Sequence, residues 1–182
     1  MKQIIALTGY KQSGKDTAYL YLRSHFTDVC RLAFADELKR EVAEILGIDT
    51  DWLNSYKNHP LFRNALQFWG QHQKEQLGKD YWTKVVCDLI VEDPKDSTYF
   101  ITDCRFPFEL EALEKIGQVC TLRILREGQV NTDKHESEVQ IDKIKSNFSL
   151  RNSGNSLKEF ERECKWVAQY IKEYFKSIKV TT

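Results

Sequence analysis

Long hydrophobic runs are missing from this 182-residue sequence, which has no stretch of 18 consecutive apolar residues. A transmembrane helix needs about 20 such residues, so we expect no membrane span. The first seven residues have one lysine and a short apolar run, without the longer apolar core and small-residue cleavage site of a signal peptide. The chain is shorter than the roughly 250–300 residues at which single cores stop growing, so we predict one domain over residues 1–182.

An excess of charge is also lacking, because 27 basic residues balance 27 acidic ones. Proteins that bind nucleic acid regardless of its sequence normally carry a basic excess, so we predict no nucleic-acid partner. A local basic patch for a small phosphorylated ligand is still compatible with this balance. The five cysteines are odd in number and form no CxxC pair, which argues against a zinc site or a disulfide framework. We therefore expect a soluble cytoplasmic protein.

Short apolar runs alternate with segments of helical periodicity along the whole chain. Strands are expected where brief apolar runs are bounded by glycine or polar residues, at 3–8, 97–102, 118–125 and 148–150. Helices are expected at 15–26, 36–46, 60–69, 80–90, 107–116 and 157–178. Alternation of this kind predicts an α/β fold of three layers, with helices on both faces of a parallel sheet.

The strongest motif is the segment Gly9–Thr17, which follows the first expected strand and opens the first expected helix. Its glycines allow a tight turn whose N–H groups converge on an anion, and the helix N-terminus adds partial positive charge. Lys15 supplies a full charge for the β- and γ-phosphates of a nucleotide. The pattern predicts a phosphate-binding loop, or P-loop.

Asp16 stands where such loops usually carry the Ser or Thr whose hydroxyl binds Mg²⁺, and Thr17 follows it. A carboxylate at this position can hold Mg²⁺ through water, orient the acceptor or remove its proton. It can also simply favour the first turn of a helix. We expect a functional role and assign Mg²⁺ to Asp16 and Thr17.

Polar side chains stand at two further strand-to-helix junctions, one after 97–102 and one at Leu32–Lys39. Asp103 and Arg105 come after 97–102, at the strand end where ligands of parallel sheets bind; the alternative is a helix-capping Asp with a surface Arg. Asp36 is interpreted as a helix N-cap.

On the helix at 60–69, Arg63 and Gln67 share one face, suited to a phosphate and a base edge, or to a solvated polar surface.

Two later segments carry candidate residues. Arg126 enters a polar stretch and is placed in a lid over about 126–146, with a plain surface loop as the alternative. Asn152 and Gly154 follow the last strand and lie against a purine or form only a turn. His135, without a cysteine pair, does not predict zinc.

Together these segments resemble the bacteriophage deoxynucleoside monophosphate kinases, within the P-loop nucleoside and nucleotide kinases. The likeness runs from residue 3 to about 175. Its motifs are the loop Ser13–Thr17, the Arg63-x-x-x-Gln67-x-x-Gly70 helix with Asp80-Tyr81-Trp82, the strand ending Asp103-x-Arg105 with Glu109, and Arg126-x-Gly128 leading to His135, Glu138 and Asn152-x-Gly154.

The resemblance implies transfer of a phosphoryl group from Mg²⁺-ATP to a deoxynucleoside monophosphate. It implies catalytic roles for Lys15, Asp16, Arg63 and Arg126. It implies ATP binding by Lys11, Ser13, Gly14, Lys15, Asp16, Thr17, Asn152 and Gly154. It implies acceptor binding by Lys11, Asp36, Lys39, Arg63, Gln67, Asp103, Arg105 and Glu109, within a helical region of about 36–93.

Two other functions stay open at this point. One is a related small-molecule kinase such as a dephospho-coenzyme A kinase, and the other is an ATP-binding protein without kinase chemistry. The partners expected are small-molecule nucleotides, and a homodimer is left open.

Overall fold

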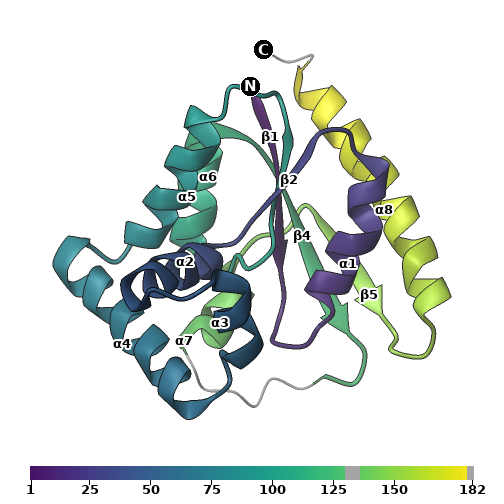
Figure 1. The fold of residues 1–182 in the computed structure, drawn as a ribbon. Coiled ribbons are helices and arrows are strands. Elements are labelled where there is room, and N and C mark those ends of the chain that lie inside the picture. Colours follow the sequence, from purple (N-terminus) through teal and green to yellow (C-terminus); the bar gives the residue numbers. More distant parts are fainter. Residues whose placement is uncertain (130–135, 180–182) are drawn as a thin grey trace.

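The sheet at the centre of the molecule has five strands, all parallel (Figure 1). The computed structural model describes residues 1–129 and 136–179, so residues 130–135 of the predicted lid, including His135, lie outside the described part. The strand order is β2-β3-β1-β4-β5. The strands are β1 (Lys2–Thr8), β2 (Val29–Leu32), β3 (Thr98–Ile101), β4 (Gly117–Arg126) and β5 (Phe148–Asn152). The predicted α/β class is confirmed.

Helices cover both faces of the sheet. Because successive side chains of a strand point to opposite faces, each strand contributes to two cores. On β1, Ile4 and Ala6 pack into one core with helices α2 (Phe34–Leu46), α5 (Tyr81–Glu92) and α6 (Pro107–Ile116). Ile5 and Leu7 pack into a second core with α1 (Lys15–Leu22) and α8 (Leu157–Lys179). The result is the predicted three-layer arrangement.

Three helix predictions need correction. The helix expected at 60–69 continues to Leu77. The first helix ends at Leu22 and continues only as a 3₁₀ turn, Arg23–His25, so the expected end at residue 26 was wrong. Asp36 is not the N-cap of α2, because that helix begins at Phe34 and its N-cap is Ala33. An additional helix, α3 (Thr50–Tyr56), was not expected, because it is too short to show a periodic pattern.

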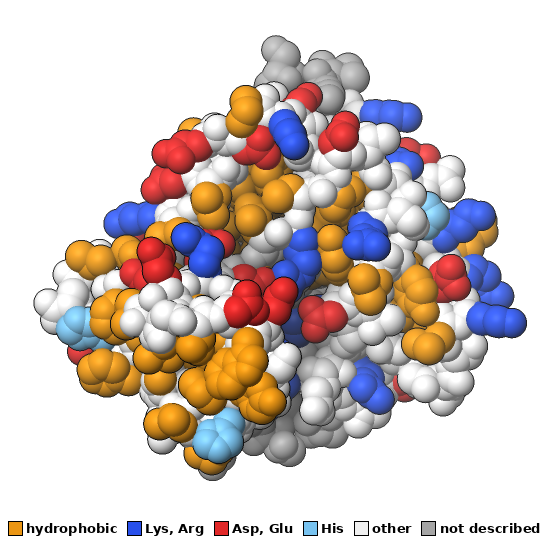
Figure 2. Space-filling model, viewed as in Figure 1, with side chains coloured by type: hydrophobic (Ala, Val, Ile, Leu, Met, Phe, Trp, Pro, Cys, Tyr) orange, Lys and Arg blue, Asp and Glu red, His pale blue; other side chains and the backbone are white. Residues whose placement is uncertain are grey.

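Helices α3 and α4 (Pro60–Leu77) extend to one side of the sheet, beside α2 (Figure 1). Hydrophobic side chains gather on the surface of this region (Figure 2), and Leu61 and Phe68 of α4 are each more than 60% exposed. No helix among the described residues is both long and apolar enough to span a membrane.

The remaining short elements lie after the undescribed segment. Helix α7 (Glu136–Gln140) and the 3₁₀ turn Ile141–Lys143 lead into β5. Ile141 is fully buried, which anchors this 3₁₀ turn to the body of the protein.

Candidate functional site

The predicted P-loop connects β1 to α1 in a conformation that requires glycine at two positions. Gly9 has φ of +143°, and a Cβ there would lie 2.5 Å from the carbonyl oxygen of Ile124 in β4. Gly14 has φ of +103° and caps α1, and a Cβ there would lie 2.5 Å from Nδ2 of Asn152. The loop therefore packs closely against the ends of β4 and β5, with backbone rather than side chains facing its neighbours.

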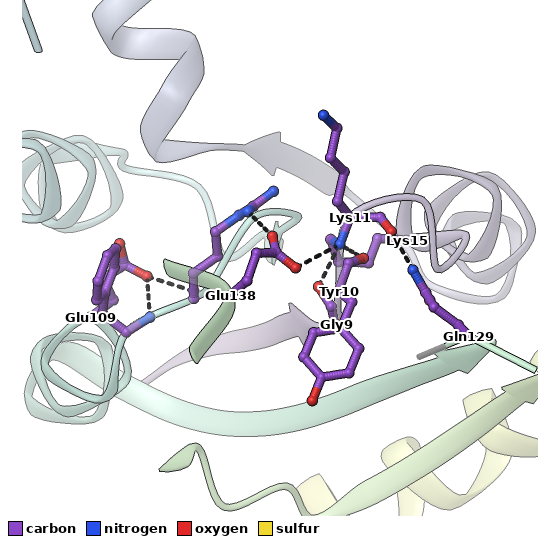
Figure 3. Close-up of polar contacts among 9 residues, drawn as sticks. Gly9, Tyr10, Lys11, Lys15, Glu109, Gln129 and Glu138 are labelled. Carbon is purple, nitrogen blue, oxygen red and sulfur yellow. Dashed lines mark hydrogen bonds and ion pairs between the residues drawn. The ribbon is translucent and has the colours of Figure 1, made fainter. Parts of the chain in front are cut away.

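Lys15 lies inside this loop with only 9% of its surface exposed. Its Nζ donates hydrogen bonds to the carbonyl oxygens of Gly9, at 2.6 Å, and Tyr10, at 2.8 Å (Figure 3). Burial lowers the pKa of Lys15 to about 8, and the positive charge of Arg105 adds to this decrease, while Glu138 opposes it. An anion bound in the loop would stabilise the charged form.

Two buried hydroxyls beside Lys15 lack hydrogen-bond partners among the described residues. They are Oγ1 of Thr8, at the end of β1, and Oγ of Ser13. Buried hydroxyls normally have a partner, so a water, an ion or a ligand is needed to satisfy these two.

The outer side of the loop contacts the end of β5. Nδ2 of Asn152 donates to the carbonyl oxygen of Ser13, at 3.0 Å, and Oδ1 accepts from the N–H of Gly154. Nη1 of Arg126 donates to the carbonyl oxygen of Gln12, at 3.1 Å. The structure thus brings the predicted residues Asn152, Gly154 and Arg126 together next to the P-loop.

A cavity of about 310 Å³ opens between α2, α4, α5 and α6. This size is at the lower end of the range for small-molecule sites, which is roughly 300–1,000 Å³. The predicted residues Asp103, Arg105 and Glu109 line it, together with Gly70 and Trp82 of the motifs that carry the resemblance. The other lining residues were not predicted: Phe34, Ala35, Leu38, Lys74, Lys79, Thr83 and Phe108.

Asp103 shapes the cavity by starting a helix. Its carboxylate accepts hydrogen bonds from the N–H groups of Phe34 and Ala35, both at 2.9 Å, and so caps α2 from the end of β3. Burial raises the pKa of Asp103, and these two donors offset part of that increase. The capping alternative is therefore correct for Asp103, although the helix it caps precedes it in the chain.

Glu109 caps the next helix in a similar way. Its Oε2 accepts from the N–H groups of Arg105, at 2.7 Å, and Phe106, at 3.0 Å, at the start of α6 (Figure 3). Burial raises the pKa of Glu109 from 4.5 to about 7, although these two hydrogen bonds favour the ionised form. The cavity thus contains a carboxyl group that titrates near neutral pH.

Glu138 joins the P-loop to the cavity; the resemblance named it among the motif residues but implied no role for it. It is 3% exposed, its Oε1 accepts from Nη1 of Arg105, and its Oε2 accepts from the N–H of Lys11, at 3.0 Å (Figure 3). Apart from that resemblance, nothing in the local sequence distinguishes it from the other acidic residues nearby. By contrast, Lys74 was within reach of sequence reasoning, because it lies on the same face of α4 as Arg63 and Gln67.

Arg63 and Gln67 are not among the residues that line the cavity, and both are exposed on α4. Gly70 and Lys74, further along the same helix, do line the cavity. Arg63 and Gln67 lie one to three turns before them, on the same face of α4. The structure therefore puts them on the face that leads to the cavity.

Asp36 and Lys39 form a separate cluster with Arg31. Asp36 accepts hydrogen bonds from both cations, each at 2.5 Å. Burial alone would raise the pKa of Asp36, but the hydrogen bonds from Lys39 and Arg31 outweigh it and hold that pKa below its usual range. Asp36 and Lys39 are sequence neighbours of Ala35 and Leu38, which line the cavity.

The remaining predicted residues face outward or lie at the first turn of α1. Lys11 and Asp16 are exposed, and the Lys11 side chain points away from Glu138 in Figure 3. Thr17 is half-buried. Among residues 1–129 and 136–179 there is no group of three or more His, Cys, Asp or Glu side chains that could hold a metal ion.

Solved structures of similar shape include the dephospho-CoA kinase from Campylobacter jejuni. The match has a TM-score of 0.52 and 14% sequence identity, and it covers 93% of this chain and 97% of that one. At this identity the match supports the fold alone, which the chain shares with that kinase.

Sequence comparison gives closer information on function. A protein of Acanthamoeba polyphaga mimivirus, provisionally named a deoxynucleotide monophosphate kinase, is 26% identical over 183 residues, 86% of this chain and 91% of its own length. The family model for deoxynucleotide monophosphate kinase matches residues 50–163, which is more than half of the chain. The chain therefore belongs to the deoxynucleotide monophosphate kinase family and is a phosphotransferase.

Proposed function

We propose that the chain transfers the γ-phosphoryl group of ATP to a deoxynucleoside 5′-monophosphate, giving the diphosphate and ADP. The observation that supports this most directly is the meeting of a P-loop with a cavity of about 310 Å³, whose lining includes the cations Arg105, Lys74 and Lys79 beside the carboxyl groups of Asp103 and Glu109. Both lie beyond the carboxyl ends of parallel strands, where α/β proteins bind their ligands.

In this proposal ATP binds on the P-loop side. The N–H groups of Ser13–Thr17, Lys15 and the unpaired hydroxyl of Ser13 contact its phosphates. Asn152 and Gly154 border the adenine, next to Arg126. Lys11 contributes from the rim of the loop.

The acceptor binds in the cavity with its phosphate directed toward Arg105. Asp103 and Glu109 shape the wall, while Arg63, Gln67, Asp36 and Lys39 contact the acceptor along the approach from α4 and α2. We assign residues of about 36–93 to the acceptor-binding region and about 126–146 to the lid, all within one domain.

The reaction joins an acceptor phosphate oxygen to the γ-phosphorus and breaks the bond from that phosphorus to the β-phosphate oxygen. Phosphoryl transfer depends mainly on alignment and on neutralising charge, so Lys15, Arg105, Arg126 and Arg63 carry most of the protein's contribution. Lid closure excludes water that would otherwise hydrolyse ATP.

The residues present are compatible with Mg²⁺. Mg²⁺ is usually bound by one or two protein oxygens together with nucleotide phosphates and water, and Asp16 and Thr17 offer such oxygens at the first turn of α1. When bound, the ion would neutralise charge on the β- and γ-phosphates.

The test is ADP release coupled to a spectroscopic readout, with Mg²⁺-ATP and a panel of acceptors. The panel holds the four common deoxynucleoside monophosphates, 5-hydroxymethyl-dCMP, the ribonucleotides and dephospho-coenzyme A. We expect release with at least one deoxynucleotide, none with dephospho-coenzyme A, and loss of turnover in a folded Lys15→Ala variant.

Three results would count against the proposal. Turnover of dephospho-coenzyme A alone would assign the chain to a different acceptor. ATP binding with no turnover of any acceptor would favour a binding protein without kinase chemistry. Full activity in folded Lys15→Ala would remove the P-loop from the mechanism.

A further inference from the structure

We propose that Glu138 is a positioning residue, whose carboxylate orients the Arg105 guanidinium for the acceptor phosphate and ties it to the P-loop. This inference rests on the function proposed above. It concerns a residue that contacts neither nucleotide in that proposal and acts through Arg105.

The carboxylate bridges two elements that are far apart in the chain. Its Oε1 is paired with Arg105 at the edge of the cavity, and its Oε2 accepts the backbone N–H of Lys11, at 3.0 Å. Arg105 is 33 residues away and Lys11 is 127 residues away. Figure 3 shows Glu138 between the P-loop and the side that carries Glu109, so the contact joins the donor and acceptor sides of the site.

Burial makes this bridge rigid and specific. The Glu138 side chain is 3% exposed, and a carboxylate removed from water is stable only when charged or polar donors satisfy its oxygens. Nη1 of Arg105 and the N–H of Lys11 are two donors that do so. Losing either contact would weaken the stabilisation of a buried charge, so the geometry of the pair is favoured.

Arg105 reaches the cavity while it is paired with Glu138. The pair involves Nη1 of its planar guanidinium. The Arg105 side chain is 29% exposed and lines the cavity. An arginine held in one orientation loses less entropy when it binds a phosphate than one that moves freely.

The carboxylate also allows two cations to lie close together. Arg105 lowers the pKa of Lys15 by its positive charge, whereas Glu138 raises it, so all three groups interact electrostatically. Without Glu138, repulsion between Lys15 and Arg105 would favour their separation and move the donor and acceptor phosphates apart.

The variant that isolates this role is Glu138→Gln. The amide oxygen of glutamine can still accept the Lys11 N–H, but its NH₂ group cannot accept from Arg105. The matched control is Glu111→Gln, which removes one exposed carboxylate from α6. Thermal unfolding of each variant, with and without ATP, verifies that the chain folds and retains the donor site.

We expect Glu138→Gln to lower kcat/KM for the acceptor by about 10- to 100-fold, through both a higher acceptor KM and a lower kcat. The dissociation constant of ATP should change by less than about threefold. Glu111→Gln should match the wild type in both measurements.

A double-mutant cycle with Arg105→Ala tests whether Glu138 acts through Arg105. If it does, Glu138→Gln should have almost no further effect in the Arg105→Ala background. Equal effects of Glu138→Gln in both backgrounds would overturn the proposal. Tighter nucleotide binding in Glu138→Gln would also overturn it, because Glu138 would then be an anion that competes with phosphate.

Wild-type turnover is measured first, so that the two proposals can fail separately. If the wild type phosphorylates no deoxynucleoside monophosphate, the proposed function is refuted and the positioning role with it. If the wild type is active and the cycle is additive, only the role of Glu138 is refuted.

Discussion

Gly14 offers the sharpest test of the P-loop geometry, because substitution by alanine carries two separate costs. Its φ of +103° is a conformation that alanine avoids, at a cost of roughly 1–2 kcal/mol. The new methyl group would also lie 2.5 Å from Nδ2 of Asn152, which donates to the carbonyl oxygen of Ser13. Displacing that side chain removes a hydrogen bond worth about 1 kcal/mol. The expected loss of unfolding free energy is therefore about 2–3 kcal/mol.

Gly47 provides a control with only the first of these costs. It ends α2 with φ of +65°, and a Cβ there would meet nothing within 4 Å. We expect Gly47→Ala to cost about 1 kcal/mol. Urea unfolding measures both losses, and Gly14→Ala should also abolish ATP binding while Gly47→Ala preserves it.

Removing the Asn152 side chain separates the two costs of Gly14→Ala, the steric clash and the unfavourable backbone conformation. In an Asn152→Ala background the clash is absent, so Gly14→Ala should cost about as much as Gly47→Ala does, about 1 kcal/mol. Equal losses for the two glycine variants in the wild-type background would refute the close packing of Asn152 against the loop.

Three further predictions concern charge and space in the site. The pKa of Lys15 falls from 10.5 to about 8 on folding, so between these pH values the unfolded chain binds more protons than the folded chain. As pH rises from 8 to 10.5, the wild type should therefore gain up to about 3 kcal/mol of stability relative to Lys15→Met. Urea unfolding measures this difference, and a difference that stays constant with pH would contradict the prediction. The pKa of Glu109 rises from 4.5 to about 7 on folding, so between these pH values the folded chain binds more protons than the unfolded chain. As pH rises from 4.5 to 7, the wild type should therefore lose up to about 3 kcal/mol of unfolding free energy relative to Glu109→Gln. If the stabilities of the two proteins change in parallel with pH, the burial argument is refuted. In Gly70→Ala the new Cβ would lie 3.1 Å from Cδ2 of Leu38 at the cavity wall. We expect little change in stability, because the better helix propensity of alanine contributes about 1 kcal/mol, and we expect a several-fold higher acceptor KM. An unchanged KM would show that the acceptor does not reach this wall.

The sequence by itself determined the features that depend on neighbouring residues. The P-loop was predictable because its turn, its helix N-terminus and Lys15 all lie within nine consecutive residues, Gly9–Thr17. The parallel sheet followed from short apolar runs alternating with helical periodicity, and those periods are local properties of the chain. The end of α2 at Leu46, directly before Gly47, was also predicted, because the helical periodicity stops there.

Tertiary structure alone decided which distant groups meet. Asp103 caps a helix whose first N–H lies 69 residues earlier, so the sequence around Asp36 suggested the wrong cap. Glu138 reaches Lys11 across 127 residues, and no local pattern encodes that contact. The cavity likewise needs side chains from several helices whose relative positions depend on packing against the sheet. Periodicity specifies which face of each element is buried, whereas the partner of that face is selected by the packing of the whole chain.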